Sequence, residues 1–271
     1  MSKPVALTYG RCQIHALVDS FNDLPGLADA YEWVRTNPET TESEPALSPD
    51  TLRRCEIFFL QIPMTREEPG FVNALPARCR VIRVPFVYCP VLWPQRCVDK
   101  REYDHAKYTV PPFFGDRVMD ELMARGGNED EILDRYFSAD LAARFKVERV
   151  MAYWERAMKE IDSRCDIPVA PFILRHFQTR RLFTCEYHCT GELLLALAIP
   201  MLEMAWGGGL PWPQVEFATL GRLVFNDVPV HPSLARALKL EWYRGDLPYR
   251  LDQQGYFLMR DYMRKYIRHE C

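Results

Sequence analysis

The chain has 271 residues, 48% of them hydrophobic and 26% charged, which is typical of a globular protein and excludes a disordered or low-complexity chain. The formal net charge is −3, so the chain lacks the overall positive charge that accompanies binding to nucleic acids. The most apolar segment, Leu193 to Trp206, is interrupted by Pro200 and Glu203 and is shorter than the roughly 20 residues that cross a bilayer. We therefore expect neither a nucleic-acid partner nor a transmembrane segment.

The cysteines and the N-terminal residues indicate the cellular compartment. The nine cysteines are irregularly spaced and odd in number, which does not favour a disulfide framework. The first residues, MSKPVALTYGRCQ, lack the long apolar stretch and the cleavage site of a secretory signal. We therefore expect a cytoplasmic protein whose thiols are reduced and mostly buried.

The first third of the chain predicts the start of an α/β sheet. Residues 5–9 form a short apolar strand candidate that ends at Gly10, and Cys12 to Phe21 carries apolar residues on one helical face. Further strands are predicted at Glu56 to Ile62 and at Arg80 to Pro85. Strand, glycine turn and helix in this order favour an α/β fold with a mainly parallel central sheet flanked by helices.

Two segments of this region are predicted to be irregular. Thr36 to Pro49 has no apolar periodicity and should be an exposed acidic loop. Phe86 to Pro94 contains too many prolines for an interior strand, so its aromatic residues should line a pocket or cap the core.

The rest of the chain predicts a large helical and irregular complement. Arg181 to Thr184 should be extended, and no internal repeat or break between domains is visible, so we expect one domain over residues 1–271. The predicted helices are Arg117–Ala124, Glu129–Phe137, a long one capped by Ser138 and running to about Ser163, Pro168–Phe177, Glu192–Trp206, Ser233–Leu240 and Tyr256–Arg268.

The turn after the first strand is the first candidate site. It reads Tyr9-Gly10-Arg11-Cys12-Gln13, and open α/β sheets bind ligands at such turns, at the carboxyl edge of the sheet. A cysteine at the start of a helix, beside an arginine, has conditions that favour its thiolate. A buried cysteine with no role in chemistry is the alternative that any single cysteine leaves open.

The segment Tyr187-His188-Cys189-Thr190 is the second candidate site. His188 follows an extended segment and precedes a helix, and an imidazole there can act as a general base near neutral pH. A histidine bonded to a backbone carbonyl is the plainer alternative. Cys185, His188 and Cys189 together offer three zinc ligands, but no matching second group is present, so no metal is expected.

Two other features complete the candidate sites. Gln61 ends the second predicted strand, and its amide could donate to a developing oxyanion or simply be an exposed strand end. A basic cluster at residues 175, 176, 180 and 181 could bind phosphate or be a solvated helix end. The chain has no phosphate-binding Walker loop, no GxGxxG, no GxSxG and no HExxH motif.

Three of these segments resemble the WcbI-type polysaccharide biosynthesis family of acetyltransferases. Residues 9–13 are close to the GNCQ start of that family, Phe59-Leu60-Gln61 matches its second strand end, and residues 165–188 match a later stretch that ends in histidine. The chain departs from the family at Arg11, where asparagine is usual, and at Cys189, where proline follows the histidine. Gln95 lies where family members often carry His-Pro-Asp.

The resemblance implies a coenzyme A-dependent enzyme that acetylates a sugar hydroxyl during biosynthesis of capsule or surface polysaccharide. Acetyl-coenzyme A would be a substrate and a carbohydrate the acceptor. Hydrolysis of an ester or thioester at a cysteine, and binding of coenzyme A or a glycan without catalysis, remain alternative functions. The candidate catalytic residues are Cys12, His188 and Gln61, and the candidate coenzyme-binding residues are Gly10, Arg11, Gln13 and Arg181.

Overall fold

The computed structural model describes residues 2–22, 24, 26–36, 47–62, 68–98, 115–207, 227–251 and 254–270. The chain forms two compact units. The single domain expected over residues 1–271 stays a prediction. The first unit comprises Met1–Val87, Arg156–Leu174 and Cys189–Leu223. The second comprises Tyr88–Glu155, Arg175–His188 and Val224–Cys271. Because the chain passes repeatedly from one unit to the other, no single stretch of sequence marks a boundary between them.

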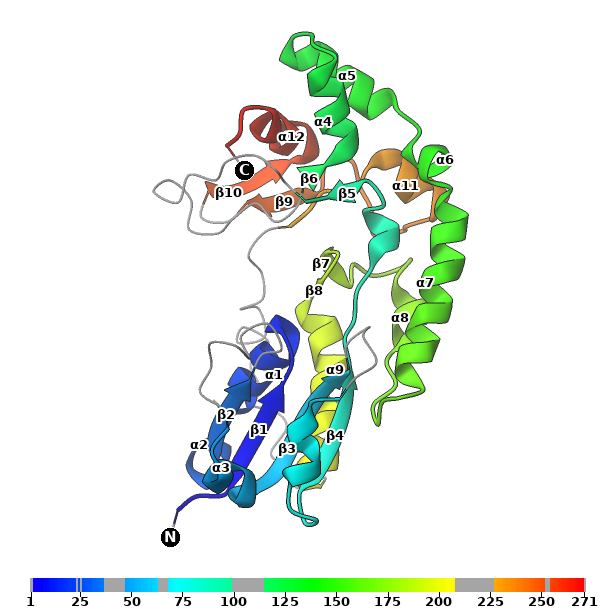
Figure 1. Cartoon of the computed structure of the whole chain (residues 1–271). Coiled ribbons are helices and arrows are strands. Elements are labelled where there is room, and N and C mark those ends of the chain that lie inside the picture. Colours follow the sequence, from blue (N-terminus) through cyan, green and yellow to red (C-terminus); the bar gives the residue numbers. More distant parts are fainter. Residues whose placement is uncertain are drawn as a thin grey trace. The chain divides into compact units, whose positions relative to one another are not determined.

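The first unit is built on a four-stranded parallel sheet with the strand order β2-β1-β3-β4 (Figure 1). The predicted fold class is confirmed. The strands are β1 (Val5–Tyr9), β2 (Glu32–Thr36), β3 (Cys55–Ile62) and β4 (Arg80–Pro85), and the helices are α1 (Cys12–Asn22), α2 (Leu27–Ala30), α3 (Pro49–Arg54), α9 (Gly191–Trp206) and the 3₁₀ turn η1 (Gly70–Ala74).

Alternate residues of the strands bury the two faces of this sheet. On one face, Phe59 of β3 packs against Phe21 of α1 and Trp206 of α9, with ring centroids 5.9 and 6.0 Å apart. On the other face, Leu52 of α3 and Phe71 of η1 cover an apolar cluster. This double burial explains why the two central strands, β1 and β3, are mostly apolar in sequence. The buried members of that cluster are Val5, Leu7, Cys55, Phe58, Leu60 and Ile62.

The second unit is mostly helical, with small two-stranded sheets. Trp154 is at the centre of its core, where its indole N–H donates to the Tyr88 carbonyl at 2.5 Å and its ring packs against Phe177 and Phe183. The helices are α4 (Arg117–Ala124), α5 (Glu129–Ser138), α6 (Leu141–Phe145), α11 (Pro232–Ala237), α12 (Met259–Ile267) and the 3₁₀ turn η2 (Pro90–Leu92), while α7 (Val147–Asp162) and α8 (Ala170–His176) cross from one unit into the other. The strands are β5 (Arg96–Cys97), β6 (Gly115–Asp116), β7 (Phe183–Cys185), β8 (His188–Cys189), β9 (Pro248–Leu251) and β10 (Gly255–Leu258).

Two predicted helices differ from those observed. The long helix expected from Ser138 is divided into α6 and α7, because Lys146 adopts a left-handed backbone conformation (φ 50°) and the Asp140 side chain caps α6 instead. The helix expected from Tyr256 begins only at Met259, because residues 255–258 pair with β9 as strand β10. The proline-rich segment Phe86–Pro94 was predicted either to line a pocket or to cap the core. Its side chains are mostly buried, so it caps the core. Most of the loop predicted at Thr36–Pro49 lies outside the described residues.

A buried carboxylate joins α4 to α5 and gives a testable stability effect. Asp116 caps α4 with one oxygen and accepts a 2.6 Å hydrogen bond from the Tyr136 hydroxyl with the other. Burial raises the pKa of Asp116, while the bond from Tyr136 lowers it. We expect Tyr136→Phe to reduce the free energy of unfolding by about 1–3 kcal/mol at pH 7, since the variant leaves one oxygen of a buried charge without a donor.

The effect should shrink in acid, because protonation of Asp116 removes the buried charge. Urea unfolding at pH 7 and pH 4 measures both values, with Tyr153→Phe as a control at an exposed tyrosine. An equal loss at both pH values would contradict this role for the Asp116 carboxylate.

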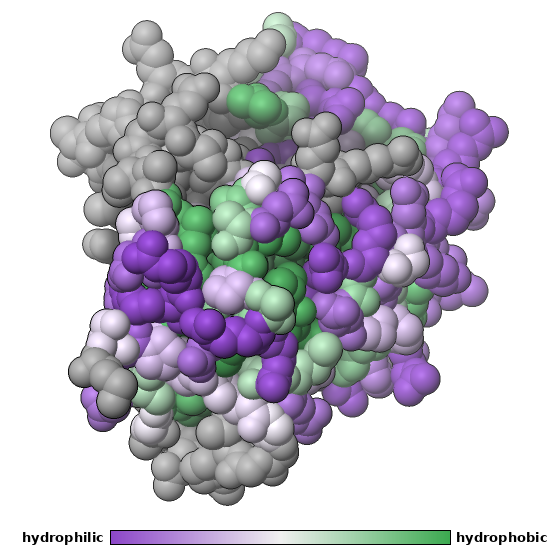
Figure 2. All heavy atoms as spheres, turned by 60° about the horizontal axis from the view of Figure 1, so that its bottom comes forward, coloured by the Kyte–Doolittle hydropathy of each residue, from purple (hydrophilic) through white to green (hydrophobic). Residues whose placement is uncertain are grey.

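The surface of the described chain carries both hydrophilic and apolar residues. In Figure 2, hydrophilic residues surround apolar ones that reach the surface near the middle of the view. None of the described helices is both long enough and apolar enough to cross a membrane.

Candidate functional site

The carboxyl edge of the parallel sheet collects the turns that follow its strands. Gly10, which follows β1, donates its backbone N–H to the Thr36 carbonyl at the end of β2 at 3.2 Å. Phe86, which follows β4, donates its N–H to the Ile62 carbonyl at the end of β3 at 3.1 Å. The prediction that Gly10 to Gln13 lie at this edge is confirmed.

Gly10 is required by the close approach of Gln61. A Cβ atom at position 10 would lie 2.6 Å from Gln61 Cβ and 2.8 Å from Gln61 Oε1, and also 2.7 Å from Ile14 Cγ2. These distances are shorter than carbon and oxygen atoms tolerate without a shift in the backbone. The missing side chain of Gly10 therefore allows Gln61 to cross beneath the turn.

Gln61 and Gln13 form a buried amide pair under this turn. Gln61 Oε1 accepts from the Arg11 backbone N–H at 2.9 Å, and Gln61 Nε2 donates to Gln13 Oε1 at 3.2 Å. Gln13 Oε1 also accepts from the Val87 N–H at 3.2 Å, and Gln13 Nε2 donates to the Val87 carbonyl at 2.6 Å. The two amides thus tie the ends of β1, β3 and β4 to one another.

Arg11 and Cys12 are exposed above this pair, whereas Gln13 and Gln61 are 0% and 3% exposed. The exposed thiol therefore lies at the first residue of the 11-residue helix α1. Helix N-termini favour negative charge, so a thiolate or a phosphate is stabilised here. The sequence placed Gln61 and Gln13 at this edge but did not indicate that their side chains bond to each other.

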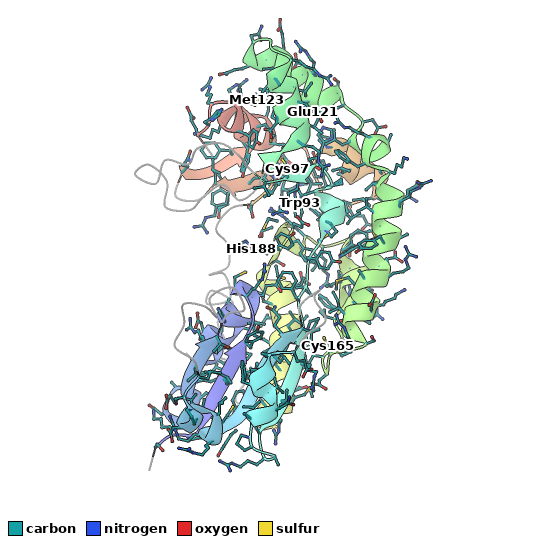
Figure 3. All side chains as sticks on the ribbon, in the orientation of Figure 1. Trp93, Cys97, Glu121, Met123, Cys165 and His188 are labelled. Carbon is teal, nitrogen blue, oxygen red and sulfur yellow. The ribbon has the colours of Figure 1, made fainter. Side chains whose placement is uncertain are left out.

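His188 lies in the second unit (Figure 3), and the segment that precedes it in the chain differs from the prediction. The segment before it, β7, is not a strand of the central parallel sheet; it pairs with β8, which contains His188 itself. The sequence led us to expect that Cys12 and His188 follow strands of one parallel sheet and so meet at its carboxyl edge. That expectation is wrong for His188, because β7 and β8 form a separate pair. Because Cys12 lies in the first unit, the pairing of the two side chains stays a prediction.

The turn between β7 and β8 is held by a partly buried ion pair. Arg96 contacts the Glu186 carboxylate at 2.9 Å and lies over the Tyr187 ring, 4.8 Å from its centroid. The Glu186 carbonyl accepts from the Cys89 N–H at 2.8 Å. Burial raises the pKa of Glu186 and lowers the pKa of the half-buried His188, so the imidazole is neutral at pH 7. A neutral imidazole can accept a proton from a hydroxyl.

Glu186 and Arg96 are absent from the sequence-based site. The only signal for them was the acidic residue next to Tyr187-His188, and its partner lies 90 positions earlier in the chain. Both residues position the turn rather than supply a reacting group.

Arg181, the predicted phosphate ligand, has partners within the second unit. Its guanidinium lies 3.2 Å from the buried Asp227 carboxylate and 5.3 Å from the centroid of the Tyr249 ring. Asp227 in turn accepts from the Arg250 backbone N–H at 2.9 Å. Coenzyme binding by Arg181 stays a prediction, and it would have to coexist with this ion pair.

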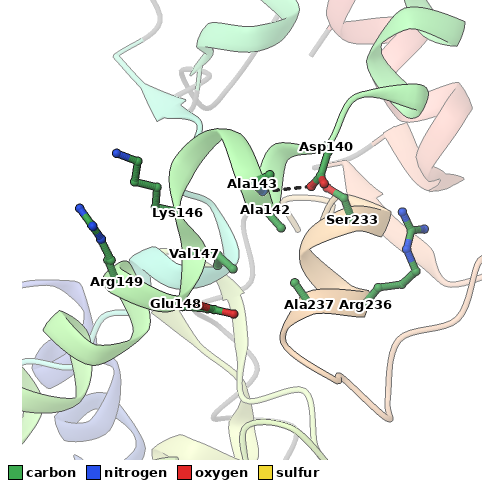
Figure 4. Close-up of a pocket in the computed structure, with 10 residues that line it drawn as sticks. All are labelled: Asp140, Ala142, Ala143, Lys146, Val147, Glu148, Arg149, Ser233, Arg236 and Ala237. Atoms are coloured by element: carbon green, nitrogen blue, oxygen red, sulfur yellow. Dashed lines mark hydrogen bonds between the residues drawn. The ribbon is translucent and has the colours of Figure 1, made fainter.

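A separate pocket of about 670 Å³ lies in the second unit between α6, the start of α7 and α11 (Figure 4). It contains none of the predicted site residues. In the close-up, Lys146 and Arg149 point away from Ala237 and Arg236, while Asp140 is bonded to the Ala143 backbone. No anion-binding arrangement of these cations is visible.

A metal site does not emerge from the described side chains. Among the residues that the structure describes, no group of three or more His, Cys, Asp or Glu residues is placed to hold an ion. The alternative of zinc at Cys185, His188 and Cys189 thus gains no support from their placement.

Comparison with known proteins identifies the family. The model of the polysaccharide biosynthesis enzyme WcbI matches residues 5–205, which confirms the resemblance in the sequence. Among solved structures, the chain is similar to WcbI, described as a novel polysaccharide biosynthesis enzyme in its native form without a disulfide bond between coenzyme A and one of its cysteines. The TM-score is 0.68 at 16% identity, covering 98% of this chain and 89% of that one. No curated protein matches the chain.

Proposed function

Because the chain belongs to the WcbI family of polysaccharide biosynthesis enzymes, we propose that it transfers an acetyl group from acetyl-coenzyme A to a sugar hydroxyl. The observation that carries this proposal is the exposed Arg11-Cys12 pair at the start of α1, supported by the buried amides of Gln13 and Gln61. The N-terminus of α1 and the Arg11 guanidinium can both bind a phosphate of coenzyme A. The neighbouring Cys12 thiol can react with a thioester.

The assignment of coenzyme A is supported by the solved structure of WcbI, which is native protein without a disulfide bond between coenzyme A and one of its cysteines. In the present chain, Cys12 is the exposed cysteine of the motif that resembles the family. We assign Arg11 to binding of the coenzyme phosphates. Gly10 lets Gln61 approach the backbone of the turn closely. Gln13 and Gln61 act as positioning residues, because each side chain is buried and bonded within the turn.

The proposed reaction uses His188 as the general base. Its neutral imidazole takes the proton of the sugar hydroxyl while the hydroxyl oxygen forms a bond to the acetyl carbonyl carbon. The carbon–sulfur bond then breaks, and His188 returns its proton to the departing thiolate of coenzyme A. The products are an acetylated sugar and free coenzyme A.

Thiol release from acetyl-coenzyme A tests this function against its alternatives. Release that requires a sugar acceptor supports transfer, and release without a sugar would establish thioester hydrolysis instead. Binding without release would show a coenzyme- or glycan-binding protein. An acyl-enzyme on Cys12 is distinguished by Cys12→Ser, which retains direct transfer but loses a covalent route.

Calorimetry with coenzyme A tests the two predicted phosphate ligands. We expect Arg11→Ala to weaken binding about tenfold, the loss typical of one charge-assisted hydrogen bond. Arg181→Ala should lower the melting temperature, because it leaves the buried Asp227 without its cation. An affinity for coenzyme A equal to that of the parent would remove Arg181 from the site, and the same result for Arg11→Ala would contradict its assignment.

A further inference from the structure

Two cysteines face each other at the amino end of the central sheet. Cys55 is the first residue of β3, and Cys79 immediately precedes β4, the neighbouring strand. Their sulfur atoms share a hydrogen bond at 3.5 Å. A disulfide bond is about 2.05 Å long, so a shift of roughly 1.5 Å would join them.

The two thiols differ in access to solvent. Cys55 is buried against the apolar cluster of the first unit, whereas Cys79 is partly exposed. Both lie at the amino ends of their strands, while Arg11, Cys12 and Gln61 lie at the carboxyl ends. A bond between Cys55 and Cys79 would therefore cross-link β3 to β4 at the edge opposite the candidate site.

We infer that Cys55 and Cys79 form a reversible disulfide when a low-molecular-weight disulfide such as oxidised glutathione is present. The Cys79 thiolate attacks one sulfur of oxidised glutathione, forms a mixed disulfide and releases the first glutathione thiolate. The Cys55 thiol then loses its proton, attacks the Cys79 sulfur and releases the second. Two protein thiols are oxidised, one glutathione disulfide is reduced, and both protons end on the glutathione released.

The order of these steps follows from the environment of each sulfur. The hydrogen bond with Cys55 lowers the pKa of Cys79, and the same bond together with burial raises the pKa of Cys55. The more accessible thiol is thus also the more readily ionised one, which suits it to meet the oxidant first.

Peptide mapping after oxidation of the folded protein tests the inference. Trypsin releases Cys55 in the peptide 55–66 and Cys79 in the dipeptide 79–80. After incubation with oxidised glutathione and blocking of the remaining thiols, we expect these two peptides joined and lighter by two hydrogen atoms than their sum. Reduced glutathione in excess should separate them. The melting temperature of the oxidised protein should rise by roughly 5 °C, since the bond closes a loop in the unfolded chain.

Matched variants and an internal standard decide between outcomes. Cys79→Ser should lose the joined peptides and the rise in melting temperature, whereas Cys165→Ser, at another partly exposed thiol, should keep both. The exposed Cys12 reports that oxidant was sufficient, because it should carry glutathione. The inference is overturned if Cys12 is fully modified by glutathione while the peptide 55–66 is recovered only with its cysteine carrying the blocking group. It is equally overturned if Cys79 retains glutathione without resolution by Cys55.

Discussion

We expect His188→Ala to lower kcat for sugar-dependent release of coenzyme A by about 10²–10⁴-fold, the contribution typical of a general base. The Michaelis constant for acetyl-coenzyme A should change little, because the proposed role of His188 is to take the proton of the acceptor hydroxyl. His176→Ala serves as the control, since that histidine lies at the end of α8 and has no part in the proposed reaction. Turnover of His188→Ala equal to that of the parent would end this mechanism.

The pH dependence of the parent enzyme supplies a second measurement of the same base. Burial lowers the pKa of His188 below its usual 6.5, so the neutral, proton-accepting form prevails at neutral pH. We expect the acid limb of the kcat/KM profile to be centred below pH 6.5. A profile whose acid limb is centred above pH 7 would assign the base to another group.

Gly10→Ala is the second change with a large expected effect. The new Cβ would overlap Gln61 and Ile14, so the turn must move or Gln61 must leave its place under it. We expect the free energy of unfolding to fall by about 1–3 kcal/mol. Binding of coenzyme A should weaken as well, because the Arg11 N–H loses its acceptor on Gln61.

Gly70→Ala provides the matched control, as a Cβ there meets nothing within 4 Å. Urea unfolding measures the stability of both variants, and calorimetry measures their affinity for coenzyme A. Both quantities should fall in Gly10→Ala and stay at the parent value in Gly70→Ala. Parent-like stability and affinity in Gly10→Ala would show that the turn can move without consequence.

The strands of the central sheet show where a sequence suffices and where it does not. β1 and β4 have the predicted bounds, because each is a short segment rich in apolar residues that ends at glycine or proline. β2 was missed, since its residues Glu32 and Arg35 are exposed at the edge of the sheet and dilute the apolar signal. The pairing partners of β10 lie earlier in the chain, and without them its residues resemble the first turn of α12.

The candidate site shows the same division. A strand, a glycine turn and a helix are local features, so the sequence placed Gly10 and Cys12 correctly at the carboxyl edge. The bond between the Gln13 and Gln61 amides depends on side chains 48 positions apart and on space that only the folded turn provides. The extended segment before His188 was taken for a strand of the central sheet, because three extended residues look alike in a central sheet and in an isolated pair.

The first unit is made of three separate segments of the chain, so its last segment is synthesised well after its sheet. The four strands of the sheet are made within the first 85 residues, but Trp206 of α9, which covers Phe59, follows more than a hundred residues later. A chain that stops before α9 lacks Trp206, so part of one apolar face of its sheet would stay uncovered. Fragments that end before α9 should therefore be less soluble than the full chain.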